Sequence, residues 1–374
     1  MNLESQIMII KNINLTTFRN YKSLHTTFNN KTNILIGNNA QGKTSVLEAI
    51  YILGLTKSHR VSRDRDVISN GAEFAKINAV VNFQEKDVDL DIIISKQGKK
   101  AKYNHIEVEK LSEYIGLFNV VMFAPEDLDL VKGNPQTRRK FLDLEIGQIS
   151  KEYLFNLQNY KKILKQRNDL LKTMQKSENK DMLLLDIITD QLLGYLDKIV
   201  VQRKEFIHKI SNYSNEIYKR LSNSNKNLVI EYIPNIKNDS KKEFIQKYQY
   251  DIITGMTNIG CHRDDIEFKL DNFYAKTHSS QGEMRTIVLA VKLALIEFVN
   301  EYRSEYPVLL LDDVLSELDE SRQQNLMKYI QSKTQTFITS TNINEINLDE
   351  IKEYQIYRIQ DGQIKESDSN GTKL

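Results

Sequence analysis

The sequence predicts an α/β fold whose core is split into two halves, with an antiparallel helical arm inserted between them. Three observations predict this arrangement. An apolar strand, a glycine-rich turn and a helical stretch follow one another over residues 34–50. A second apolar strand, over residues 307–313, ends in two carboxylates. Between these segments, residues 138–222 change to leucine and isoleucine at helical spacing.

The first observation is a phosphate-binding loop, because the turn has the pattern G-x-x-x-x-G-K-T between a strand and a helix. In such a loop the backbone N–H groups and the helix N-terminus surround phosphates, and the two glycines permit close approach. The lysine reaches the β- and γ-phosphates, and the hydroxyl that follows it ligates Mg²⁺. The predicted ATP-binding residues are Gly37, Asn38, Asn39, Ala40, Gln41, Gly42, Lys43, Thr44 and Ser45.

The second observation is the acidic strand end at Asp312 and Asp313. We expect Asp312 to hold Mg²⁺ together with Thr44, directly or through water. Asp313 lies one residue further on, where its carboxylate can orient or deprotonate an attacking water, so it is the candidate catalytic residue. An Asp-Asp pair alone is more typical of a solvated strand end, and only the phosphate loop favours the nucleotide role.

A third motif is the small-residue turn at Ser280, Gln281, Gly282 and Glu283, which opens another helix. Ser280 can simply cap that helix, with Glu283 completing a capping box. The same helix N-terminus is also an anion site, so both interpretations stay open. A phosphate loop, a distant acidic strand and such a turn are together typical of a split, two-lobed ABC/SMC-type P-loop ATPase head that works as a sandwich dimer.

The remaining strands follow from apolar–polar alternation. Residues 8–36 are expected to form short strands, and residues 75–110 an antiparallel meander. Residues 120–123 are a further core strand, strands return at residue 228, and residues 343–374 end in a short hairpin and a polar tail.

The helical part is expected to form a two-helix arm that turns back at the polar segment 176–181. Its second helical run, residues 182–221, spans roughly 60 Å if it is unbroken. Ordinary core helices are the alternative for part of this region. The expected domains are 1–137 for the N-terminal ATPase half, 138–225 for the arm and 226–374 for the C-terminal ATPase half.

Composition restricts the class of protein. Of 374 residues, 40% are apolar and 27% are charged, as in a soluble globular protein. The single cysteine, Cys261, excludes an intramolecular disulfide and suits a reducing compartment. No apolar run reaches membrane-spanning length and the polar start is not a signal peptide, so a cytoplasmic location without membrane contact is expected. A net charge of +2 gives no indication of nucleic-acid binding, so any basic surface must be local. The candidate DNA-binding residues are Lys57, Arg60, Arg63 and Arg65.

Other polar residues allow two interpretations each. Arg19 is either on the nucleotide side or a surface-loop arginine. The segment 262–265 (His-Arg-Asp-Asp) lacks the spacing of a zinc site, and a structural or nucleotide-adjacent turn is favoured. Tyr153 and Tyr160, with three neighbouring lysines, are expected on a solvated helix face, with a DNA-binding track as the alternative.

In these motifs the chain resembles the RecF family of bacterial recombination-mediator ATPases over nearly its whole length. The resemblance rests on short blocks in one order: residues 18–21 (FRNY), 37–50, 57–60 (KSHR), 123–128 (FAPEDL), 131–133, 138–143 (RRKFLD), 166–168, 262–265, 280–286 and 311–319. It implies a slow ATPase that dimerises on ATP, with the turn at Ser280 facing the γ-phosphate bound by the other subunit. It also implies a role in recombinational repair, replication restart and the SOS response, in which the dimer clamps DNA at single-strand gaps and duplex junctions and promotes RecA loading with RecO and RecR.

The main alternative is the nucleotide-binding subunit of a transporter. Such ATPases place a glutamine after the strand ending near Phe123 and a histidine after the last core strand. Residues 125–127 (Pro-Glu-Asp) and 339–342 (Thr-Ser-Thr-Asn) stand there instead. The residues that polarise the attacking water and sense the γ-phosphate therefore cannot be assigned from the sequence.

Overall fold

The computed structural model describes residues 6–178 and 180–369, which form two compact units. The first unit comprises the described parts of Met1–Asp127, Glu216–Asn225 and Thr286–Leu374, and the second comprises those of Leu128–Asn215 and Lys226–Arg285. This division differs from the expected domains, because residues 226–285 associate with the helical arm and not with the C-terminal ATPase half. Helix packing within the second unit gives the reason, as described below.

A largely parallel sheet forms the centre of the first unit. Its strand order is β17–β16–β4–β15–β14–β9, and only β17 runs antiparallel to its neighbour. Strands β4, β9, β14 and β15 are buried at every residue, as expected of a parallel sheet with both faces covered. The bounds are β4 Thr32–Ile36, β9 Val120–Phe123, β14 Val308–Leu311, β15 Thr336–Ser340, β16 Tyr354–Gln360 and β17 Gln363–Ser369. The predicted strand at 120–123 and the C-terminal hairpin are confirmed, while the end of the polar tail, 370–374, lies outside the described residues.

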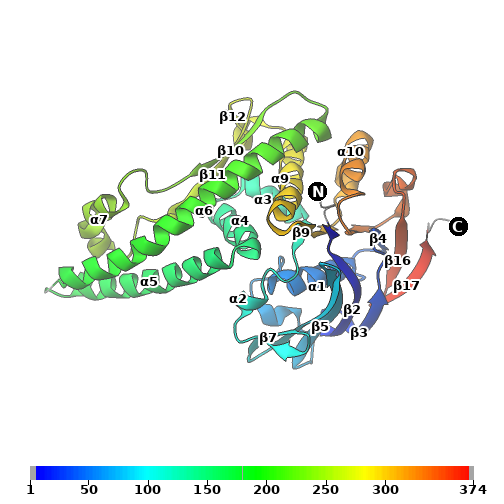
Figure 1. The fold of residues 1–374 in the computed structure, drawn as a ribbon, viewed down its shortest axis with the longest axis horizontal. Coiled ribbons are helices and arrows are strands. Elements are labelled where there is room, and N and C mark those ends of the chain that lie inside the picture. Colours follow the sequence, from blue (N-terminus) through cyan, green and yellow to red (C-terminus); the bar gives the residue numbers. More distant parts are fainter. Residues whose placement is uncertain (1–5, 179, 370–374) are drawn as a thin grey trace. The chain divides into compact units, whose positions relative to one another are not determined.

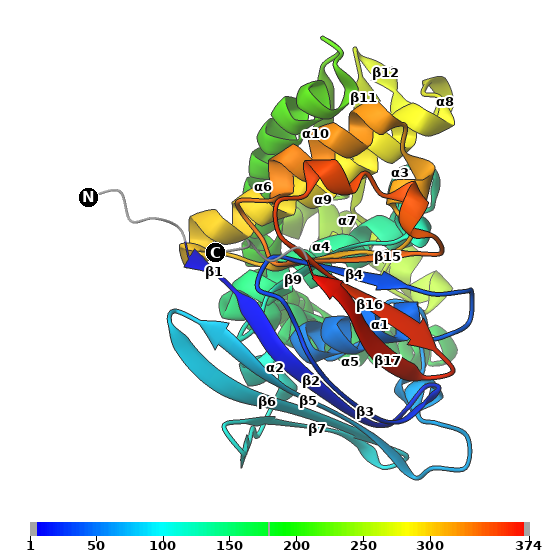
Figure 2. The ribbon, with the colours of Figure 1, turned by 90° about the vertical axis from the view of Figure 1, so that its right-hand side faces the viewer.

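A second, antiparallel sheet of the same unit has the order β3–β2–β5–β6–β7–β8, which confirms the short N-terminal strands and the meander. Its strands are β2 Ile9–Phe18, β3 Tyr21–Thr27, β5 Phe74–Phe83, β6 Lys86–Ser95, β7 Gly98–Tyr103 and β8 Ile106–Glu107. Helix α1, Lys43–Leu55, packs against both sheets, touching β9 and β15 on one side and β5 and β6 on the other (Figure 2). Every residue of α1 except Thr44 is buried, as expected of a helix that is apolar on all sides.

Smaller elements complete the first unit. The strands are β1 Gln6–Ile7 and β13 Glu305–Tyr306, and the α-helices are α2 Leu111–Tyr114 and α10 Glu320–Ile330. Short 3₁₀ helices, labelled η, are η1 Asp64–Val67, η2 Pro125–Leu128, η4 Leu315–Glu317, η5 Ile343–Glu345 and η6 Leu348–Glu350. Helix α9, Gln281–Arg303, begins in the second unit and continues into the first.

The second unit contains the helical arm. Helices α5, Lys151–Lys176, and α6, Met182–Ser222, lie side by side along the arm (Figure 1). At 1.5 Å per residue the 41 residues of α6 span about 60 Å. The helices are separated at the predicted polar segment, whose described side chains Lys176, Glu178, Lys180 and Asp181 are exposed; Asn179 lies outside the described residues. Both expectations, the arm and its turn, therefore agree with the structure.

Residues 226–285 contain a small sheet of their own and join the helical arm through helix packing. Strands β10, Leu228–Ile233, and β11, Asp265–Leu270, pair with each other and extend to β12, Phe273–Tyr274. Helix α7, Ser240–Thr254, packs on α5, and Gln175 Nε2 donates to the carbonyl oxygen of Ile253 at 2.6 Å. The remaining elements are α3 Asp129–Lys132, α4 Pro135–Ile149, η3 Cys261–Arg263 and α8 Ala275–His278.

The His-Arg-Asp-Asp segment is the polar centre of the second unit. Arg203 of α6 is buried and pairs with Asp264 and Asp143, at 2.8 Å in each case. Arg138 of α4 binds both carboxylate oxygens of Asp265, at 2.5 and 3.0 Å. Since these bonds tie α4, α6 and β11 together, the segment is a structural turn, one of the two interpretations favoured from the sequence.

The expectation for the two tyrosines of α5 is wrong. Tyr153 and Tyr160 are buried, not solvated. The hydroxyl of Tyr153 lies 2.9 Å from Asp143 Oδ1 and accepts from Arg203 Nε, and the hydroxyl of Tyr160 lies 2.7 Å from His262 Nδ1. The hydroxyl groups are satisfied by partners distant in sequence, which allows both rings to enter the core.

Candidate nucleotide-binding site

The glycine-rich loop connects β4 to α1, as predicted. Gly42 is the N-cap of α1 and has φ +116°, a conformation that favours glycine, and a Cβ there would come within 2.7 Å of Tyr21 Oη. Gly37 is required for a different reason: a Cβ would overlap the carbonyl oxygen of Ile359 in β16. Asn38, Asn39 and Ala40 are exposed at the tip of the loop. The loop is therefore shaped by its own scaffold before any ligand binds.

Lys43 is turned back onto this loop. Its Nζ donates to the carbonyl oxygens of Gly37, at 2.5 Å, and Asn38, at 3.1 Å. Burial lowers the pKa of Lys43, and the carboxylates of Asp313, Asp312 and Glu345 oppose that effect. A polyphosphate would offer this partly desolvated ammonium better acceptors than two neutral carbonyls.

The predicted metal ligands meet at the carboxyl ends of the parallel strands. Thr44 Oγ1 donates to Asp312 Oδ1 at 3.0 Å, although the two residues are 268 positions apart. Thr339, in β15, donates to the same oxygen at 2.7 Å. Burial raises the pKa of Asp312, and these hydroxyl groups act against it.

The distance between these two oxygens tests whether they fit Mg²⁺. The ion holds oxygen ligands at 2.0–2.1 Å in octahedral geometry, so neighbouring ligands lie about 3 Å apart. The 3.0 Å separation of Thr44 Oγ1 and Asp312 Oδ1 matches adjacent corners of such an octahedron. The donor set, a hydroxyl and a carboxylate, is also one that Mg²⁺ accepts.

Asp313 has a different environment from Asp312. It is exposed, and its backbone has φ +54°, in the left-handed region that is uncommon for residues other than glycine. The N–H of Asp313 donates to Thr339 Oγ1 at 2.8 Å, which fixes the turn. The strained turn presents one carboxylate to the strand edge and the next to solvent, so the two have distinct chemical roles.

These residues line a pocket of about 480 Å³, within the usual size range of small-ligand sites. The lining consists of Arg19, Asn20, Asn39, Ala40, Gly42, Lys43, Thr44, Ser45, Asp66, Ile68, Asp312, Asp313 and Thr339. Of the sequence-predicted ATP-binding residues, Gly37, Asn38 and Gln41 belong to the loop but do not line this pocket.

The turn between β2 and β3 supports the loop, a role that sequence reasoning did not assign. Asn20 Nδ2 donates to the carbonyl oxygen of Gln41 at 3.0 Å, and Tyr21 Oη donates to that of Gly42 at 3.2 Å. From the C-terminal hairpin, the N–H of Asp361 donates to Gln41 Oε1 at 2.5 Å. The FRNY block was the available signal, but the spatial contact joins residues up to 320 positions apart.

Arg19 lines the pocket, where one of the two interpretations from the sequence placed it. Its Nε and Nη2 donate to the two carboxylate oxygens of Glu48, at 2.8 and 2.6 Å, and its Nη1 donates to the carbonyl oxygen of Asp66 at 2.8 Å. Burial alone would raise the pKa of Glu48, but hydrogen bonds from Arg19 and Ser58 hold it below its ordinary value. Glu48 is therefore a buried, ionised carboxylate beside the pocket.

The basic segment after α1 presents Lys57, Arg60, Arg63 and Arg65 to solvent. Its one histidine is different: both ring nitrogens of His59 are buried without a hydrogen-bond partner among the described residues, and its ring lies 5.2 Å from that of Tyr51 in α1. Burial lowers the pKa of His59, against the nearby carboxylates of Glu48, Asp312 and Glu126. The segment thus combines an exposed cationic side with an inner side that packs on α1.

The small-residue turn, residues 280–283, lies in the second unit and opens α9. The N–H of Ser280 donates to Glu283 Oε2 at 2.8 Å, and the N–H of Glu283 donates to Ser280 Oγ at 3.2 Å, so the predicted capping box is present. Ser280 and Gln281 are exposed, and Lys226 Nζ pairs with Glu283 at 2.6 Å. The helix N-terminus is therefore accessible as well as capped, and Gly282 completes the four predicted residues.

The positions that carry switch residues in transporters contain other groups. Asp127 Oδ2 accepts from the N–H of Ala124 at 2.8 Å, and Asp127 Oδ1 pairs with Lys292 Nζ at 2.8 Å. After β15, Ser340 Oγ donates to Glu345 Oε2 at 2.5 Å. Glu126, the residue before Asp127, is exposed.

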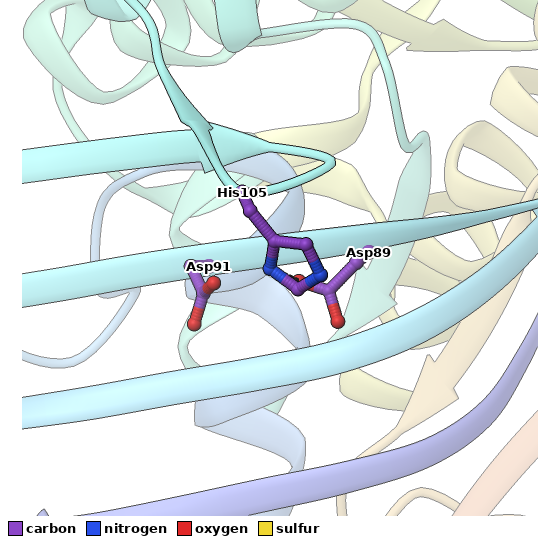
Figure 3. A group of neighbouring side chains, drawn as sticks. All are labelled: Asp89, Asp91 and His105. Atoms are coloured by element: carbon purple, nitrogen blue, oxygen red, sulfur yellow. Dashed lines mark ion pairs between the residues drawn. The ribbon is translucent and has the colours of Figure 1, made fainter.

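A separate cluster of metal-capable side chains lies on the antiparallel sheet. Asp89 and Asp91 of β6 and His105 of the β7–β8 turn approach one another within 4.8 Å (Figure 3). Lys76 Nζ pairs with Asp91 at 2.8 Å, Asn78 Nδ2 donates to Asp89 at 3.0 Å, and His105 Nδ1 lies 3.5 Å from Asp89. Both carboxylates already have protein partners, so we interpret the cluster as a polar ladder across the sheet.

The chain matches the family model described as "RecF/RecN/SMC N terminal domain" over residues 9–365. It is 43% identical to the DNA replication and repair protein RecF of Bacillus subtilis, with 96% of this chain and 100% of the relative covered. The corresponding protein of Geobacillus kaustophilus is 44% identical, with 96% and 99% covered.

Solved structures with a similar fold include RecF and Smc head domains. The recombination mediator protein RecF with ATP, described as part of the RecFOR pathway, gives a TM-score of 0.91 at 30% identity, covering 98% of this chain and 100% of that one. The Smc head domain of Pyrococcus furiosus gives 0.57 at 17% identity, with 96% of each chain covered, which supports the fold alone.

Proposed function

The chain belongs to the RecF family, and from that premise we propose that it is an ATP-dependent DNA-binding protein of DNA replication and repair in the RecFOR pathway. The observation that carries the proposal is the 3.0 Å pairing of Thr44 with Asp312 at the edge of a pocket lined by the phosphate loop.

ATP binds through the loop, with its phosphates at the N-terminus of α1 and Lys43 shifting from the loop carbonyls to the β- and γ-phosphates. Thr44 and Asp312 hold Mg²⁺, which supplies charge neutralisation at the phosphates when bound. That RecF has been solved with ATP supports this assignment.

Hydrolysis is slow. Asp313 orients or deprotonates the attacking water, since its exposed carboxylate follows the metal-binding carboxylate directly. Glutamine and histidine are absent from the two switch regions, which removes groups that other ATPases of this architecture use to polarise the water.

ATP acts as the link between two copies of the chain. The exposed capping turn of Ser280 and Gln281 in one copy faces the γ-phosphate bound by the other. Dimerisation brings together the basic segments with Lys57, Arg60, Arg63 and Arg65, which clamp DNA at single-strand gaps and duplex junctions. RecO and RecR are the partners, RecA loading is the outcome, and the protein acts in the cytoplasm.

The transporter alternative is not favoured, because the relatives and the solved ATP complex are RecF proteins. Among the described residues, no helix is both long and apolar enough to cross a membrane.

Lys43→Ala tests the proposal. Charge-assisted hydrogen bonds contribute about 1.5–3 kcal/mol each, so ATP affinity should fall about 10- to 100-fold, and ATP-dependent dimerisation should fall with it. Equilibrium titration with ATP and Mg²⁺ measures this. Lys333→Ala is the control, since Lys333 pairs with Glu297 outside the pocket. Wild-type ATP affinity in Lys43→Ala would overturn the site assignment.

A further inference from the structure

Glu48 is fully buried in α1, yet its carboxylate is charged. It accepts hydrogen bonds from Arg19, which lines the pocket, and from Ser58, which belongs to the basic segment. One carboxylate oxygen accepts from Arg19 Nε at 2.8 Å. The other accepts from both Arg19 Nη2, at 2.6 Å, and Ser58 Oγ, at 2.5 Å. Because a buried carboxylate has no water to replace a lost partner, Arg19 and Ser58 are held in fixed positions relative to each other.

Arg19 connects this carboxylate to the pocket. It lines the pocket, and its backbone has φ +53°, an unusual conformation for arginine that the surrounding hydrogen bonds maintain. Contacts among the described residues use three of its five N–H bonds, two to Glu48 and one to the carbonyl oxygen of Asp66. Two N–H bonds are left for a ligand, so Arg19 can bind a phosphate without releasing Glu48.

Ser58 connects the same carboxylate to the basic segment. While its hydroxyl donates to Glu48, its oxygen accepts from the N–H groups of Arg60, at 3.0 Å, and Val61, at 3.1 Å. The first turn of the segment is thus built on Ser58.

The far end of the segment is fixed to Arg19. Besides the bond to Asp66, the N–H of Arg19 donates to the carbonyl oxygen of Val67 at 2.7 Å. Asp66 and Ile68 themselves line the pocket. Both ends of residues 58–67 are therefore attached to the Arg19–Glu48 pair, one end through each partner.

We propose that Glu48 is a positioning residue that couples nucleotide binding to the conformation of the basic segment 57–65. The coupling rests on the proposed function, in that the ligand of the pocket is a nucleotide. The Arg19 guanidinium is already held by Glu48 and by the carbonyl oxygen of Asp66, and a bound phosphate restrains it further. Glu48 transmits this restraint to Ser58 at the start of the segment, and Asp66 transmits it to the end of the segment. Because such coupling is reciprocal, DNA phosphates that order the segment increase nucleotide affinity.

Amide hydrogen exchange of residues 57–67, with and without ATP and Mg²⁺, tests the coupling without DNA. In the wild type, ATP should slow exchange at Arg60, Val61 and Asp66 by about fivefold or more, the lower limit of usual coupling between linked sites. Glu48→Gln keeps the size of the side chain but cannot accept both Arg19 bonds. At saturating ATP, confirmed by titration, its exchange at these amides should no longer respond to ATP.

Glu297→Gln is the matched control. Glu297 also accepts from a cation and a hydroxyl, Lys333 at 2.6 Å and Tyr329 at 2.5 Å, in the same unit but outside the pocket. This variant should show the wild-type response. If Glu48→Gln does not fold, Ser58→Ala decides: the ATP response should disappear at Arg60 and Val61 and persist at Asp66.

The outcomes separate the two levels of inference. Failure of the wild type to bind ATP contradicts the proposed function. Normal ATP binding without slower exchange in the segment overturns the coupling alone. An unchanged ATP response in Glu48→Gln, or in Ser58→Ala at Arg60 and Val61, also overturns it.

Discussion

Asp312→Asn should separate the stability of the free protein from its stabilisation by ligand. The amide has the shape of the carboxylate, and its oxygen still accepts from Thr44 and Thr339, so the fold should be kept. The amide is, however, uncharged and therefore a weaker ligand for Mg²⁺ than a carboxylate. We therefore expect the variant to fold normally and to lose the stabilisation that ATP provides only in the presence of Mg²⁺.

The direction of the effect on the free protein follows from the pKa. Burial raises the pKa of Asp312 in the folded state, so the stability that this group contributes is fully present below its pKa in the unfolded chain and is lost as pH rises through the raised pKa. Each unit of such a shift corresponds to about 1.4 kcal/mol. At neutral pH the uncharged Asn variant should thus be at least as stable as the wild type, and the contribution of this group to the pH dependence should disappear.

Thermal unfolding monitored by fluorescence measures both effects. A ligand at 100 times its Kd stabilises the wild type by about 2.7 kcal/mol, and this gain should depend on Mg²⁺. Asp349→Asn, which neutralises an exposed carboxylate of the same unit, controls for the change in net charge. If Asp312→Asn retained the Mg²⁺-dependent rise in Tm, Asp312 could not be the metal ligand.

Three further predictions concern turnover, dimerisation and the arm. Asp313→Asn should bind ATP and stay dimeric while hydrolysis falls by about 10²–10⁴; normal phosphate release would exclude Asp313 as the base. Ser280→Arg should bind ATP as a monomer but fail in ATP-induced dimerisation, measured by sedimentation, and in DNA binding. DNA is titrated at two salt concentrations, because protein contacts with DNA phosphates weaken as salt increases. Normal dimerisation of the variant would contradict the clamp. Limited trypsin digestion should cut first within 176–181 and leave ATP binding intact; protection of that segment would be inconsistent with an exposed arm turn.

Local patterns predicted the parts of the fold that depend on neighbouring residues. The phosphate loop was recognised because a strand, two glycines and a helix follow one another. Residues 120–123 formed the predicted strand because they are a short run of large apolar residues between Asn119 and the break at Pro125. The proximity of Thr44 and Asp312 was also expected, because both were assigned to one Mg²⁺ site from their motifs.

The missed features depend on contacts between distant residues. Tyr153 and Tyr160 are buried because their hydroxyl partners are Arg203 and His262, 50 and 102 positions away. Nothing near either tyrosine indicates these partners. Similarly, the role of Glu48 follows from Arg19 and Ser58 together, and an isolated glutamate in a helix is more often a surface residue.

The position of β4 in the parallel sheet has a consequence for biosynthesis. Its two neighbours are β15 and β16, so the strand that carries the phosphate loop has partners only about 300 residues later in the chain. At 5–20 residues per second, a ribosome needs about 15–60 s to make that intervening chain. During this time neither edge of β4 has its native partner, and its unpaired N–H and C=O groups are open to incorrect pairing. The pocket can be completed only after Thr339 has been made.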